Sequence, residues 1–465
     1  MAKPGTELKG KRVLVVGLAR TGVPTALFCA DHGARVTAAD SGAEAQLTEA
    51  ATTLARAGVA LELGAHRRET FLAQDLIIPS PGVPFNQVDL AAARANGVTV
   101  WSEIELAWRF LRGKLIAVTG SNGKTTTTAL LGHILLTHGI PALVGGNIGT
   151  PLISLVARST DASITVAEVS SFQLEAIAAF RPDISVLLNL TPDHLDRHGS
   201  MGAYTAAKAR LFENQEKDDA AVLNADDAES ARFASIRARK FWFSRKRDVE
   251  QGACLRGDKL VYRYEGHETE LLSRSAIGLR GDHNLENVLA AALAARLAGA
   301  PPEAIAEGVR TFAGVEHRLQ FVGEVDGISF YNDSKATNVD AALKAVDAFP
   351  GNLLVILGGK DKGSPYSPLR EPLRQRARAV FLIGAAAGKI ASQLAGAVPA
   401  EMSGTLAVAV LSAFESARPG DTVLLAPACS SFDQFDNYEH RGRVFVEIVQ
   451  QIAAARAEEN ARPRA

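Results

Sequence analysis

Residues 115–131 combine an apolar run, a glycine loop and a lysine in an order typical of phosphate binding. The run Leu115-Ile116-Ala117-Val118 predicts a strand, and the apolar spacing after the loop predicts a helix. Backbone N–H groups of such a loop, together with the helix dipole, favour an anion. Lys124 would reach the outer phosphates of a nucleotide, and the hydroxyl of Thr125 would bind Mg²⁺. Although the glycine spacing is shorter than in the usual motif, we predict an ATP site at Gly120, Ser121, Asn122, Gly123, Lys124, Thr125 and Thr126.

Further along, polar side chains follow apolar runs that read as buried strands. Glu168 ends the run 164–167, and a carboxylate at a strand end close to a phosphate loop suits Mg²⁺. His194 and His198 lie four residues apart, so zinc has to be considered. A nearby proline and glycine make a helix there uncertain and no third ligand is evident, so we do not expect zinc. Lys208, inside a helix expected over residues 204–212, would by default be solvated.

A second strand-to-glycine turn stands at the start of the chain. A strand over residues 11–16 runs into Gly17 and Gly22, a helix is expected over 24–30, and a strand over 35–39 ends in Asp40. The pattern is that of a dinucleotide fingerprint, in which an acidic residue follows about twenty residues after the glycines. Ala19 replaces the middle glycine, which disfavours a nicotinamide cofactor. We predict a Rossmann-like unit that binds a nucleotide diphosphate.

Two further segments leave alternatives open. Three prolines and a glycine in residues 79–84 fix an extended loop at a strand end. In an open α/β sheet this edge binds ligands, but the loop could also be only a rigid turn. Asn284 and Asn287 stand where the Ala-rich helix 288–298 begins, either as caps or as hydrogen-bond partners of a nucleobase edge.

The last third of the chain repeats the α/β pattern. Strands are expected at residues 328–331, 353–357, 380–383 and 422–425, and each ends in small, polar or charged residues. This is typical of a doubly wound domain with a ligand-binding edge. The fold class is therefore α/β with three domains: a Rossmann-like domain over 1–112, a central P-loop ATPase-type domain over 113–315, and a Rossmann-like C-terminal domain over 316–465.

Composition limits the possible partners. The chain has 465 residues, 47% of them hydrophobic and 22% charged, with a formal net charge of −1, so no global field attracts nucleic acid or an anionic membrane. Residues 1–12 lack the apolar stretch of a signal peptide, and the uncharged window 139–157 is interrupted by prolines and glycines, which predicts a loop and no membrane span. Cys29, Cys254 and Cys429 form no CxxC pair, which favours buried, reduced thiols in a cytoplasmic protein.

Taken together, these motifs resemble the Mur ligase family. The short phosphate loop with its threonines is shared with the related folylpolyglutamate synthetases, and the segments 146–149, 168–175 and 283–287 support the Mur ligases. Asn332-Asp333-Ser334-Lys335-Ala336-Thr337-Asn338 and Ser430-Ser431-Phe432-Asp433-Gln434-Phe435 resemble the members that add D-glutamate. The resemblance spans nearly the whole chain. It implies ATP-dependent addition of D-glutamate to UDP-N-acetylmuramoyl-L-alanine in peptidoglycan precursor synthesis, by a monomer.

The resemblance also implies roles for individual residues. Asn287, Arg318 and Asp333 would join the phosphate loop in binding ATP, and Lys124, His194 and Lys208 would be catalytic. Two Mg²⁺ ions would be held by Thr125, Glu168, His194 and Lys208, the last as a carbamate formed with CO2. The UDP-sugar would contact Leu18, Ala19, Arg20, Thr21, Asp40, Ser41, Gly82, Asn147 and His194. D-Glutamate would contact Thr337, Lys362, Ser431, Phe432 and Tyr438, with Lys360 competing for the role of Lys362.

Three other functions compete with this interpretation. A folylpolyglutamate synthetase shares the phosphate loop, but that family is expected to begin with its ATPase domain. A nicotinamide-dependent oxidoreductase would use the first glycine turn, where Ala19 counts against it. A nucleotide switch would hydrolyse ATP to drive a partner, and it would not need the two ligase substrates.

Overall fold

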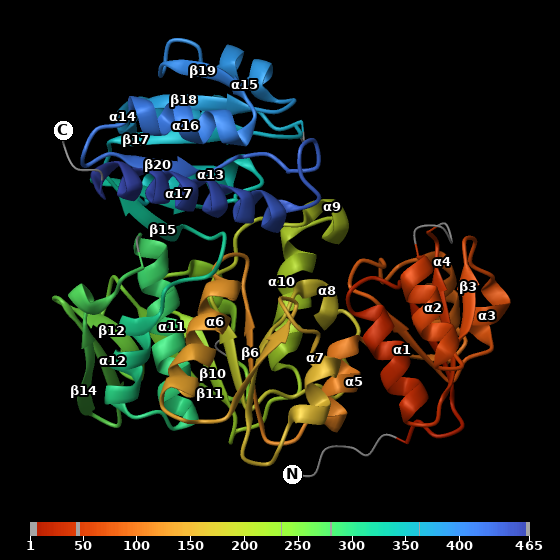
Figure 1. Cartoon of the computed structure of the whole chain (residues 1–465). Coiled ribbons are helices and arrows are strands. Elements are labelled where there is room, and N and C mark those ends of the chain that lie inside the picture. The colour runs from red at the N-terminus through yellow and green to blue at the C-terminus, as the bar shows by residue number, and fades with distance from the viewer. Residues whose placement is uncertain (1–6, 43–46, 234, 280, 362, 462–465) are drawn as a thin grey trace. The chain divides into compact units, whose positions relative to one another are not determined.

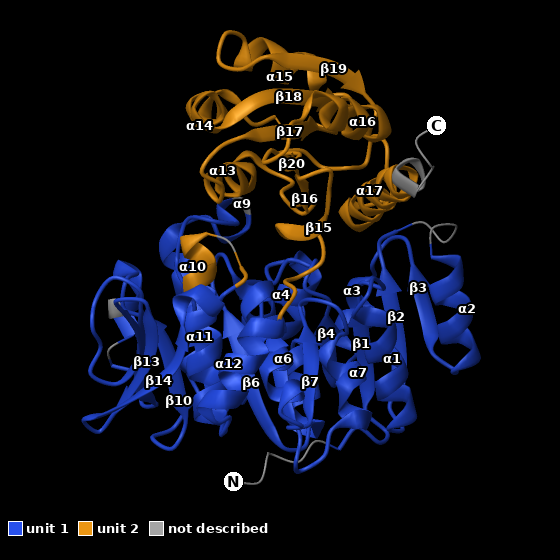
Figure 2. Cartoon of the chain, turned by 60° about the vertical axis from the view of Figure 1, so that its left-hand side comes forward, with its two compact units in different colours: residues 1–277, 286–311 blue, residues 278–285, 312–465 orange. Residues whose placement is uncertain are grey.

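A computed structural model describes residues 7–42, 47–233, 235–279, 281–361 and 363–461, and within them the chain forms three successive β-sheets (Figure 1). By compactness it divides into two units, one of residues 1–277 with 286–311 and the other of 278–285 with 312–465 (Figure 2). The boundaries predicted at residues 112/113 and 315/316 stay predictions.

The N-terminal sheet has five parallel strands in the order β3-β2-β1-β4-β5. Apolar side chains alternate along β1 and pack on both faces of the sheet, with Val13 and Val15 on the face of α1 and Leu14 and Val16 on the face of α4. The strands are β1 Arg12–Val16, β2 Arg35–Asp40, β3 Ala60–Leu63, β4 Leu76–Pro79 and β5 Thr99–Val100. The helices are α1 Gly22–Asp31, α2 Thr48–Arg56, α3 Arg68–Leu72, α4 Val88–Ala95 and α5 Glu103–Phe110.

The central sheet has nine strands in the order β14-β13-β12-β11-β10-β9-β6-β8-β7, and β6 lies between β9 and β8. Strands β12, β13 and β14 pair antiparallel and the others parallel. The strands are β6 Lys114–Thr119, β7 Ala142–Gly146, β8 Ile164–Glu168, β9 Ile184–Leu187, β10 Ala220–Asn224, β11 Arg239–Ser244, β12 Gly252–Arg256, β13 Lys259–Tyr264 and β14 His267–Ser273. The helices are α6 Lys124–Thr137, α7 Leu152–Leu155, α8 Ser171–Leu174, α9 Leu195–His198, α10 Met201–Ala209, α11 Asp282–Ala298 and α12 Pro302–Thr311.

One hydrophobic core joins the N-terminal and central sheets. It includes Val13 and Cys29 on one side and Ala117 and Leu187 on the other, with Trp108 of α5 between them along the chain. A continuous core of this kind explains why the N-terminal and central sheets fall into one compact unit.

The C-terminal sheet has six strands in the order β15-β16-β20-β17-β18-β19, with β15 antiparallel at one edge. Helices α13, α14 and α15 pack on one face, and α16 and α17 on the other. The strands are β15 Gln320–Val325, β16 Ile328–Asn332, β17 Leu353–Gly358, β18 Ala377–Ile383, β19 Ala400–Gly404 and β20 Thr422–Leu425. The helices are α13 Val339–Asp347, α14 Arg370–Arg376, α15 Ala387–Leu394, α16 Leu406–Ser416 and α17 Tyr438–Ala461.

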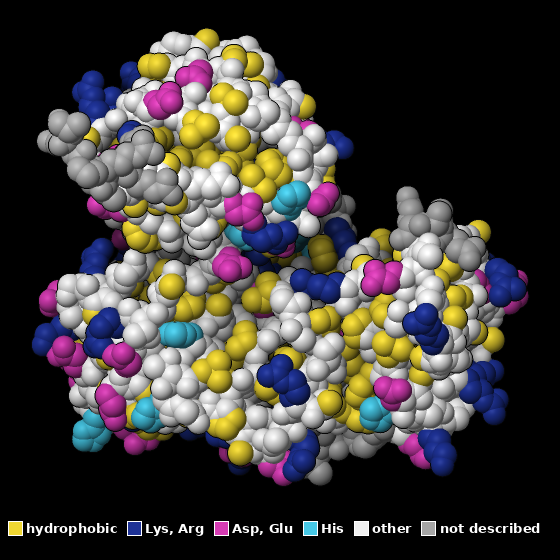
Figure 3. Space-filling model, in the orientation of Figure 1, with side chains coloured by type: hydrophobic (Ala, Val, Ile, Leu, Met, Phe, Trp, Pro, Cys, Tyr) yellow, Lys and Arg dark blue, Asp and Glu magenta, His cyan; other side chains and the backbone are white. Residues whose placement is uncertain are grey.

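The predicted three-domain α/β fold is confirmed, while one local prediction is wrong. Residues 139–157, expected as a loop, contain β7 and α7, because short apolar runs between the prolines and glycines suffice to form both. No helix among the described residues is long and apolar enough to cross a membrane. Figure 3 shows charges of both signs mixed over the visible face, as the small net charge leads one to expect.

Candidate active site

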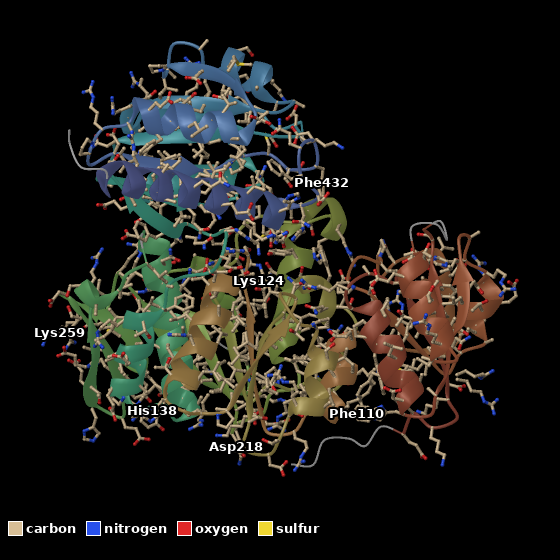
Figure 4. All side chains as sticks on the ribbon, viewed as in Figure 1. Phe110, Lys124, His138, Asp218, Lys259 and Phe432 are labelled. Carbon is tan, nitrogen blue, oxygen red and sulfur yellow. The ribbon has the colours of Figure 1, made fainter. Side chains whose placement is uncertain are left out.

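The phosphate loop lies where β6 ends and α6 begins, and Figure 4 labels Lys124 there. Gly120 has φ +150° and Gly123, the residue before the helix, has φ +85°, backbone conformations that other residues rarely adopt. The Lys124 Nζ donates to the carbonyl oxygens of Gly120 and Ser121, both at 2.9 Å. The lysine is therefore held over its own loop by atoms that a phosphate oxygen could replace.

Side chains from the strand-β9 side fix the shape of the loop. The Ser121 hydroxyl donates to the Thr191 carbonyl oxygen at 2.8 Å and lies 2.9 Å from the Tyr204 hydroxyl. The Asn122 N–H donates to the Asn189 side chain at 2.9 Å. The Ser121 N–H also donates to Asn189 O at 3.0 Å, so residues after β9 hold both the backbone and the side chains of the loop.

Asn287 lies directly against the loop. A Cβ atom on Gly123 would come 2.1 Å from Asn287 Oδ1, and the Thr127 hydroxyl lies 3.4 Å from the same oxygen. The interpretation of Asn287 as a cap is wrong, because α11 begins at Asp282 and Asn287 lies inside the helix. Its role at ATP stays a prediction, and Thr126, also predicted there, is buried.

Glu168 ends β8 and is 2% exposed. The Thr125 hydroxyl donates to its Oε2 at 2.8 Å, and the Asn147 amide donates to its Oε1 at 2.9 Å. The structure thus brings Thr125 and Glu168, both predicted to hold Mg²⁺, into direct contact. A carboxylate and a hydroxyl oxygen are ligands of the hard kind that Mg²⁺ prefers, so the donor set fits the metal.

Lys208 is buried beneath the same loop, at 1% exposed, so its default interpretation as a solvated lysine is wrong. Its Nζ donates to Gly120 O at 2.9 Å and Thr119 Oγ1 at 3.2 Å. Burial, followed by the positive charge of Lys124, lowers the pKa of Lys208 well below its ordinary value, and Asp193 and Glu168 act in the opposite direction. A neutral amine is the form that can capture CO2, so this environment fits a carbamate.

His194 stands apart from this cluster in the described structure. Its side chain is exposed, its Nε2 lies 3.5 Å from Asp193 Oδ2, and its ring meets the Phe172 ring at 4.8 Å. No hydrogen bond joins it to Glu168 or Lys208 among the described residues. Among all residues that the structure describes, no group of three His, Cys, Asp or Glu side chains is placed to hold a metal ion. The three cysteines are buried and free.

A pocket of about 320 Å³ opens at the carboxyl edge of the N-terminal sheet. The Leu18 N–H donates to Asp40 Oδ2 at 2.7 Å, and Arg20 Nη2 donates to Asn147 O at 2.6 Å, which closes the pocket towards the central sheet. Of the residues predicted for the UDP-sugar, Leu18 and His194 do not line the pocket. The predicted residues that line it are Ala19, Arg20, Thr21, Asp40, Ser41, Gly82 and Asn147.

Sequence reasoning missed several residues around this pocket. His66, Ser80 and Gln173 line it but were not predicted as site residues, although Ser80 lies in the proline-rich loop 79–84 and Gln173 in the segment 168–175. Arg197 donates to Pro81 O at 2.8 Å and Val83 O at 3.0 Å, so it ties the proline-rich loop to the segment that carries His194. The only sequence signal was the position of Arg197 among charged residues after a strand. The same loop, whose role the sequence left open, borders the pocket.

In the second unit, Asp333 follows β16 and accepts from the Leu319 N–H at 3.2 Å. Burial raises the pKa of Asp333 to about 6, while the Leu319 N–H, Arg318 and Lys335 act to lower it. Arg318 and Asp333, both predicted to bind ATP, are thus close enough to interact electrostatically.

Of the residues predicted for D-glutamate, Thr337, Ser431 and Phe432 lie on loops after strands of the C-terminal sheet, and Tyr438 begins α17. The Ala428 N–H donates to Ala336 O at 2.8 Å, and the Lys360 N–H donates to Ser430 O at 2.9 Å, so the loops after β16, β17 and β20 meet. Thr337 is half-buried, Ser431 is 2% exposed, and Phe432, labelled in Figure 4, is 65% exposed. Lys335 Nζ lies 5.3 Å from the Tyr438 ring centre. Lys362 lies outside the described residues.

Arg441, which the sequence did not point to, holds these loops together. Its fully buried guanidinium donates to Ser334 Oγ at 3.0 Å, to Ser334 O at 2.8 Å and to Cys429 O at 3.3 Å. Burial lowers its pKa to about 10. It therefore brings a positive charge beneath the carboxyl edge of this sheet.

Three family profiles match the chain in order: the Mur ligase MurD-like N-terminal domain at residues 11–102, the Mur ligase middle domain at 118–295, and the Mur ligase glutamate ligase domain at 317–429. A UDP-N-acetylmuramoylalanine--D-glutamate ligase of Acidobacterium capsulatum is 54% identical over 458 residues, which are 98% of this chain and 99% of that protein. Proteins of the same name from Koribacter versatilis and Solibacter usitatus are 50% and 52% identical, over 96% and 95% of this chain and 99% and 98% of theirs.

Solved structures agree in fold. A UDP-N-acetylmuramate-alanine ligase of Thermotoga maritima has a TM-score of 0.59 at 19% identity, covering 95% of this chain and 100% of that one. A pseudomurein peptide ligase type C of Methanothermus fervidus has a TM-score of 0.58 at 20% identity, with the same coverage. Three profiles in order, together with relatives of this identity over almost the full length, establish that the chain belongs to the Mur ligase family.

Proposed function

We propose that the chain is an ATP-dependent ligase that adds D-glutamate to UDP-N-acetylmuramoyl-L-alanine, with ADP and phosphate as products, in peptidoglycan precursor synthesis. The observation that carries this proposal is the identity of 50–54% to D-glutamate ligases over at least 95% of the chain. The contact of the phosphate loop with Glu168 supports it, because a ligase of this kind must hold ATP and its metal at one place.

The reaction joins a carboxylate to an amine, which do not react at neutral pH. The substrate carboxylate attacks the γ-phosphorus of ATP, and ADP leaves, so that an acyl phosphate forms. The amine of D-glutamate, as the free base, then attacks the acyl carbon, and phosphate leaves from the tetrahedral intermediate. Bound Mg²⁺ would offset the negative charges of the reacting groups.

The residues of the first unit divide this work. Lys124 leaves the carbonyl oxygens of its own loop and holds the transferring phosphoryl group in line. Thr125 and Glu168 would hold one Mg²⁺, and Lys208, as a carbamate, would hold a second with His194. The pocket around Asp40 holds the uridine diphosphate, with Arg20 and Asn147 between it and the phosphate loop. Leu18 contributes its backbone, and Asn287 contacts ATP beside Gly123.

In the second unit, the loops after β16, β17 and β20 hold D-glutamate. Two carboxylates need a cation and several hydroxyl or amide donors. We assign Thr337, Ser431, Phe432 and Tyr438 to this site, with Lys362 as the cation and Arg318 and Asp333 at ATP. The enzyme acts as a cytoplasmic monomer, with the three sheets as three functional domains.

Phosphate release tests the function directly. A ligase releases phosphate from ATP only when UDP-N-acetylmuramoyl-L-alanine and D-glutamate are both present. Release with ATP alone would indicate a nucleotide switch, and release with a folate acceptor in place of the UDP-sugar would indicate a folylpolyglutamate synthetase. L-Glutamate serves as the matched control for the amino acid.

The two lysines after β17 form a matched pair for the amino-acid site. Lys362→Ala should raise the KM for D-glutamate at least tenfold, on the order of 1.4 kcal/mol, and leave the KM for ATP unchanged. Lys360→Ala should have the smaller effect. The reverse order would move the role to Lys360, and equal effects on both KM values would contradict the placement.

A further inference from the structure

Helix α5 begins with a sequence that predicts a capping box, but its side chains point elsewhere. Ser102 occupies the cap position and Glu105 follows three residues later, as in that motif. The Ser102 hydroxyl makes no cap hydrogen bond. Glu105 instead accepts from the N–H groups of Ala178, Ala179 and Phe180, at 2.7 to 3.2 Å. The start of α5 is therefore used to attach the helix to the central sheet.

A small cavity of about 10 Å³ lies beside this helix start. Ser102 and Glu103 of α5 line it together with Gln173 of α8, and so do Ser80 and Pro81 of the proline-rich loop. That volume is about one water-sized probe, so the cavity can hold a single water molecule if enough polar groups face it.

Ser102, Glu103 and Gln173, which line this cavity, each have one buried side-chain atom with no hydrogen-bond partner among the described residues: Ser102 Oγ, Glu103 Oε2 and Gln173 Nε2. Their residues are 4%, 2% and 1% exposed. Leaving a buried donor or acceptor unsatisfied costs about 1–3 kcal/mol each, so three such atoms at one place need an explanation.

Hydrogen bonds made by Oε1 of Glu103 and Oε1 of Gln173 show which atom of each side chain is left without a partner. Gln173 Oε1 accepts from the Ser170 N–H at 3.0 Å and its hydroxyl at 3.1 Å, so the amide nitrogen is the end left over. Glu103 Oε1 accepts from the Ile153 N–H at 2.6 Å, which leaves Oε2 over. A donor, an acceptor and a hydroxyl remain, a set that one water molecule satisfies.

We propose that this cavity binds one water molecule, which accepts from Gln173 Nε2 and donates to Glu103 Oε2 and Ser102 Oγ, and that Glu103 is thereby a positioning residue for the nucleotide-sugar pocket. Ser80, Pro81, Val83 and Gln173 line both the cavity and the pocket of about 320 Å³. The water would join α5 to α8 beneath the loop on which the uridine diphosphate rests. The positioning role of Glu103 rests on the proposed function, whereas the water site does not.

The charge on Glu103 depends on the same contacts. Burial raises the pKa of Glu103 to about 7, and the N–H groups of Ile153 and Leu152 and the charge of Arg20 act to lower it. Glu175 also lines the cavity, but it pairs with Arg197 at 3.2 Å and lies 3.5 Å from His198 Nδ1. A water that donates to Oε2 favours the ionised form of Glu103, which is the stronger acceptor.

A high-resolution crystal structure of the full chain tests the water site itself. Density for one water within hydrogen-bond distance of all three atoms is the expected result. Direct side-chain contacts that close the cavity, or an empty cavity, would overturn the proposal.

Calorimetric binding of UDP tests the positioning role. Glu103→Gln should raise the Kd of UDP about tenfold and Ser102→Ala about threefold, with the Kd of ATP unchanged as the sign that both variants fold. Ser185→Ala is the matched control, because its hydroxyl in β9 is equally buried and unpartnered but does not line the cavity. It should bind UDP like the parent chain.

The possible results separate the two claims. If the parent chain fails to bind UDP, the proposed nucleotide-sugar site is wrong. If the parent chain binds UDP and Glu103→Gln and Ser102→Ala bind it equally well, the positioning role of Glu103 is wrong. An effect of Ser185→Ala as large as that of Ser102→Ala would also overturn it, because loss of any buried hydroxyl would then suffice.

Discussion

Two turns of the first unit, at residues 16–22 and 119–124, share the order of strand, glycine and helix but differ in what fills the space above the glycines. The first borders a pocket of about 320 Å³. The second is covered by the Lys124 ammonium, which binds two carbonyl oxygens of its own loop. One local pattern thus gives an open pocket in one place and a lysine-covered anion site in the other. The residue after the last glycine differs, since Val23 follows Gly22 whereas Lys124 follows Gly123.

The glycines of the two turns are also needed for different reasons. A Cβ on Gly22 would come 1.8 Å from Gly17 O, so the first turn needs glycine for its own backbone packing. A Cβ on Gly123 would meet Asn287 Oδ1 at 2.1 Å, so the second turn needs glycine to let another helix approach. Tertiary contact limits the first turn as well, because a Cβ on Gly17 would lie 3.0 Å from Ser80 Cβ.

Replacing Lys124 should have the largest effect of all, and it should act on the second turn alone. If Lys124 stabilises the transferring phosphoryl group, Lys124→Ala should lower kcat by about 10³-fold, whereas UDP should bind with unchanged Kd because the first turn is intact. Steady-state kinetics and calorimetry measure the two effects. Lys114→Ala, an exposed lysine at the start of β6, is the control. Normal turnover of Lys124→Ala would remove the ATP site from this loop.

The lysine beneath the second turn should give the next largest effect. Lys208→Arg keeps the positive charge but cannot form the carbamate, so we expect at least a hundredfold loss of kcat with UDP binding retained. A crystal structure of the parent enzyme should show three atoms of extra density beyond Nζ. An active Lys208→Arg enzyme would contradict the carbamate, and Lys217→Arg at an exposed position serves as the control.

Adding one methyl group to each turn compares the glycines directly. Gly123→Ala should raise the KM for ATP about tenfold or more, because the methyl group displaces Asn287 and the backbone stays strained at φ +85°. Gly17→Ala should act on UDP instead, because its methyl group would lie 3.0 Å from Ser80 Cβ beside the pocket. If both variants weakened binding of the same nucleotide, the two turns would not serve different ligands.

Replacing Asp40, the carboxylate at the first turn, should have a smaller effect. Asp40→Asn keeps one acceptor for the Leu18 N–H but loses the charge, so we expect the Kd of UDP to rise about threefold to tenfold and the KM for ATP to stay unchanged. Asp31→Asn, at the end of α1, is the control. An equal rise for both nucleotides would show a general loss of structure.

The smallest effect concerns pH. Glu103 has a pKa of about 7 in the folded chain against an ordinary 4.5, so its contribution to stability is complete below pH 4.5 and is lost as the pH rises through 7. The free energy of unfolding of the parent chain relative to Glu103→Gln should therefore fall by about 1–3 kcal/mol between pH 4.5 and 8. Urea unfolding at both pH values measures this difference. A difference between the two chains that stays the same at both pH values would contradict the raised pKa of Glu103.

Local features of the fold were predictable from the sequence because they depend on neighbouring residues. Apolar runs placed β6, β8 and β16. The phosphate loop was recognisable because strand, glycines, lysine and helix start follow one another within ten residues or so. The helix start of α11 was misplaced, because polar residues at its beginning hid the first turns of the helix.

Periodicity and neighbouring residues were enough to predict the α/β class, the two glycine turns and the acid at the end of β8 from the amino-acid sequence. Only the tertiary structure decided that Lys208 is buried beneath Gly120 and that Arg197 reaches the carbonyl oxygens of Pro81 and Val83. It also placed Glu105 of α5 against the N–H groups of residues 178–180, which form a loop before β9. The reason is physical: the pKa and partners of a polar side chain depend on which distant segments exclude water around it, and this depends on the whole fold.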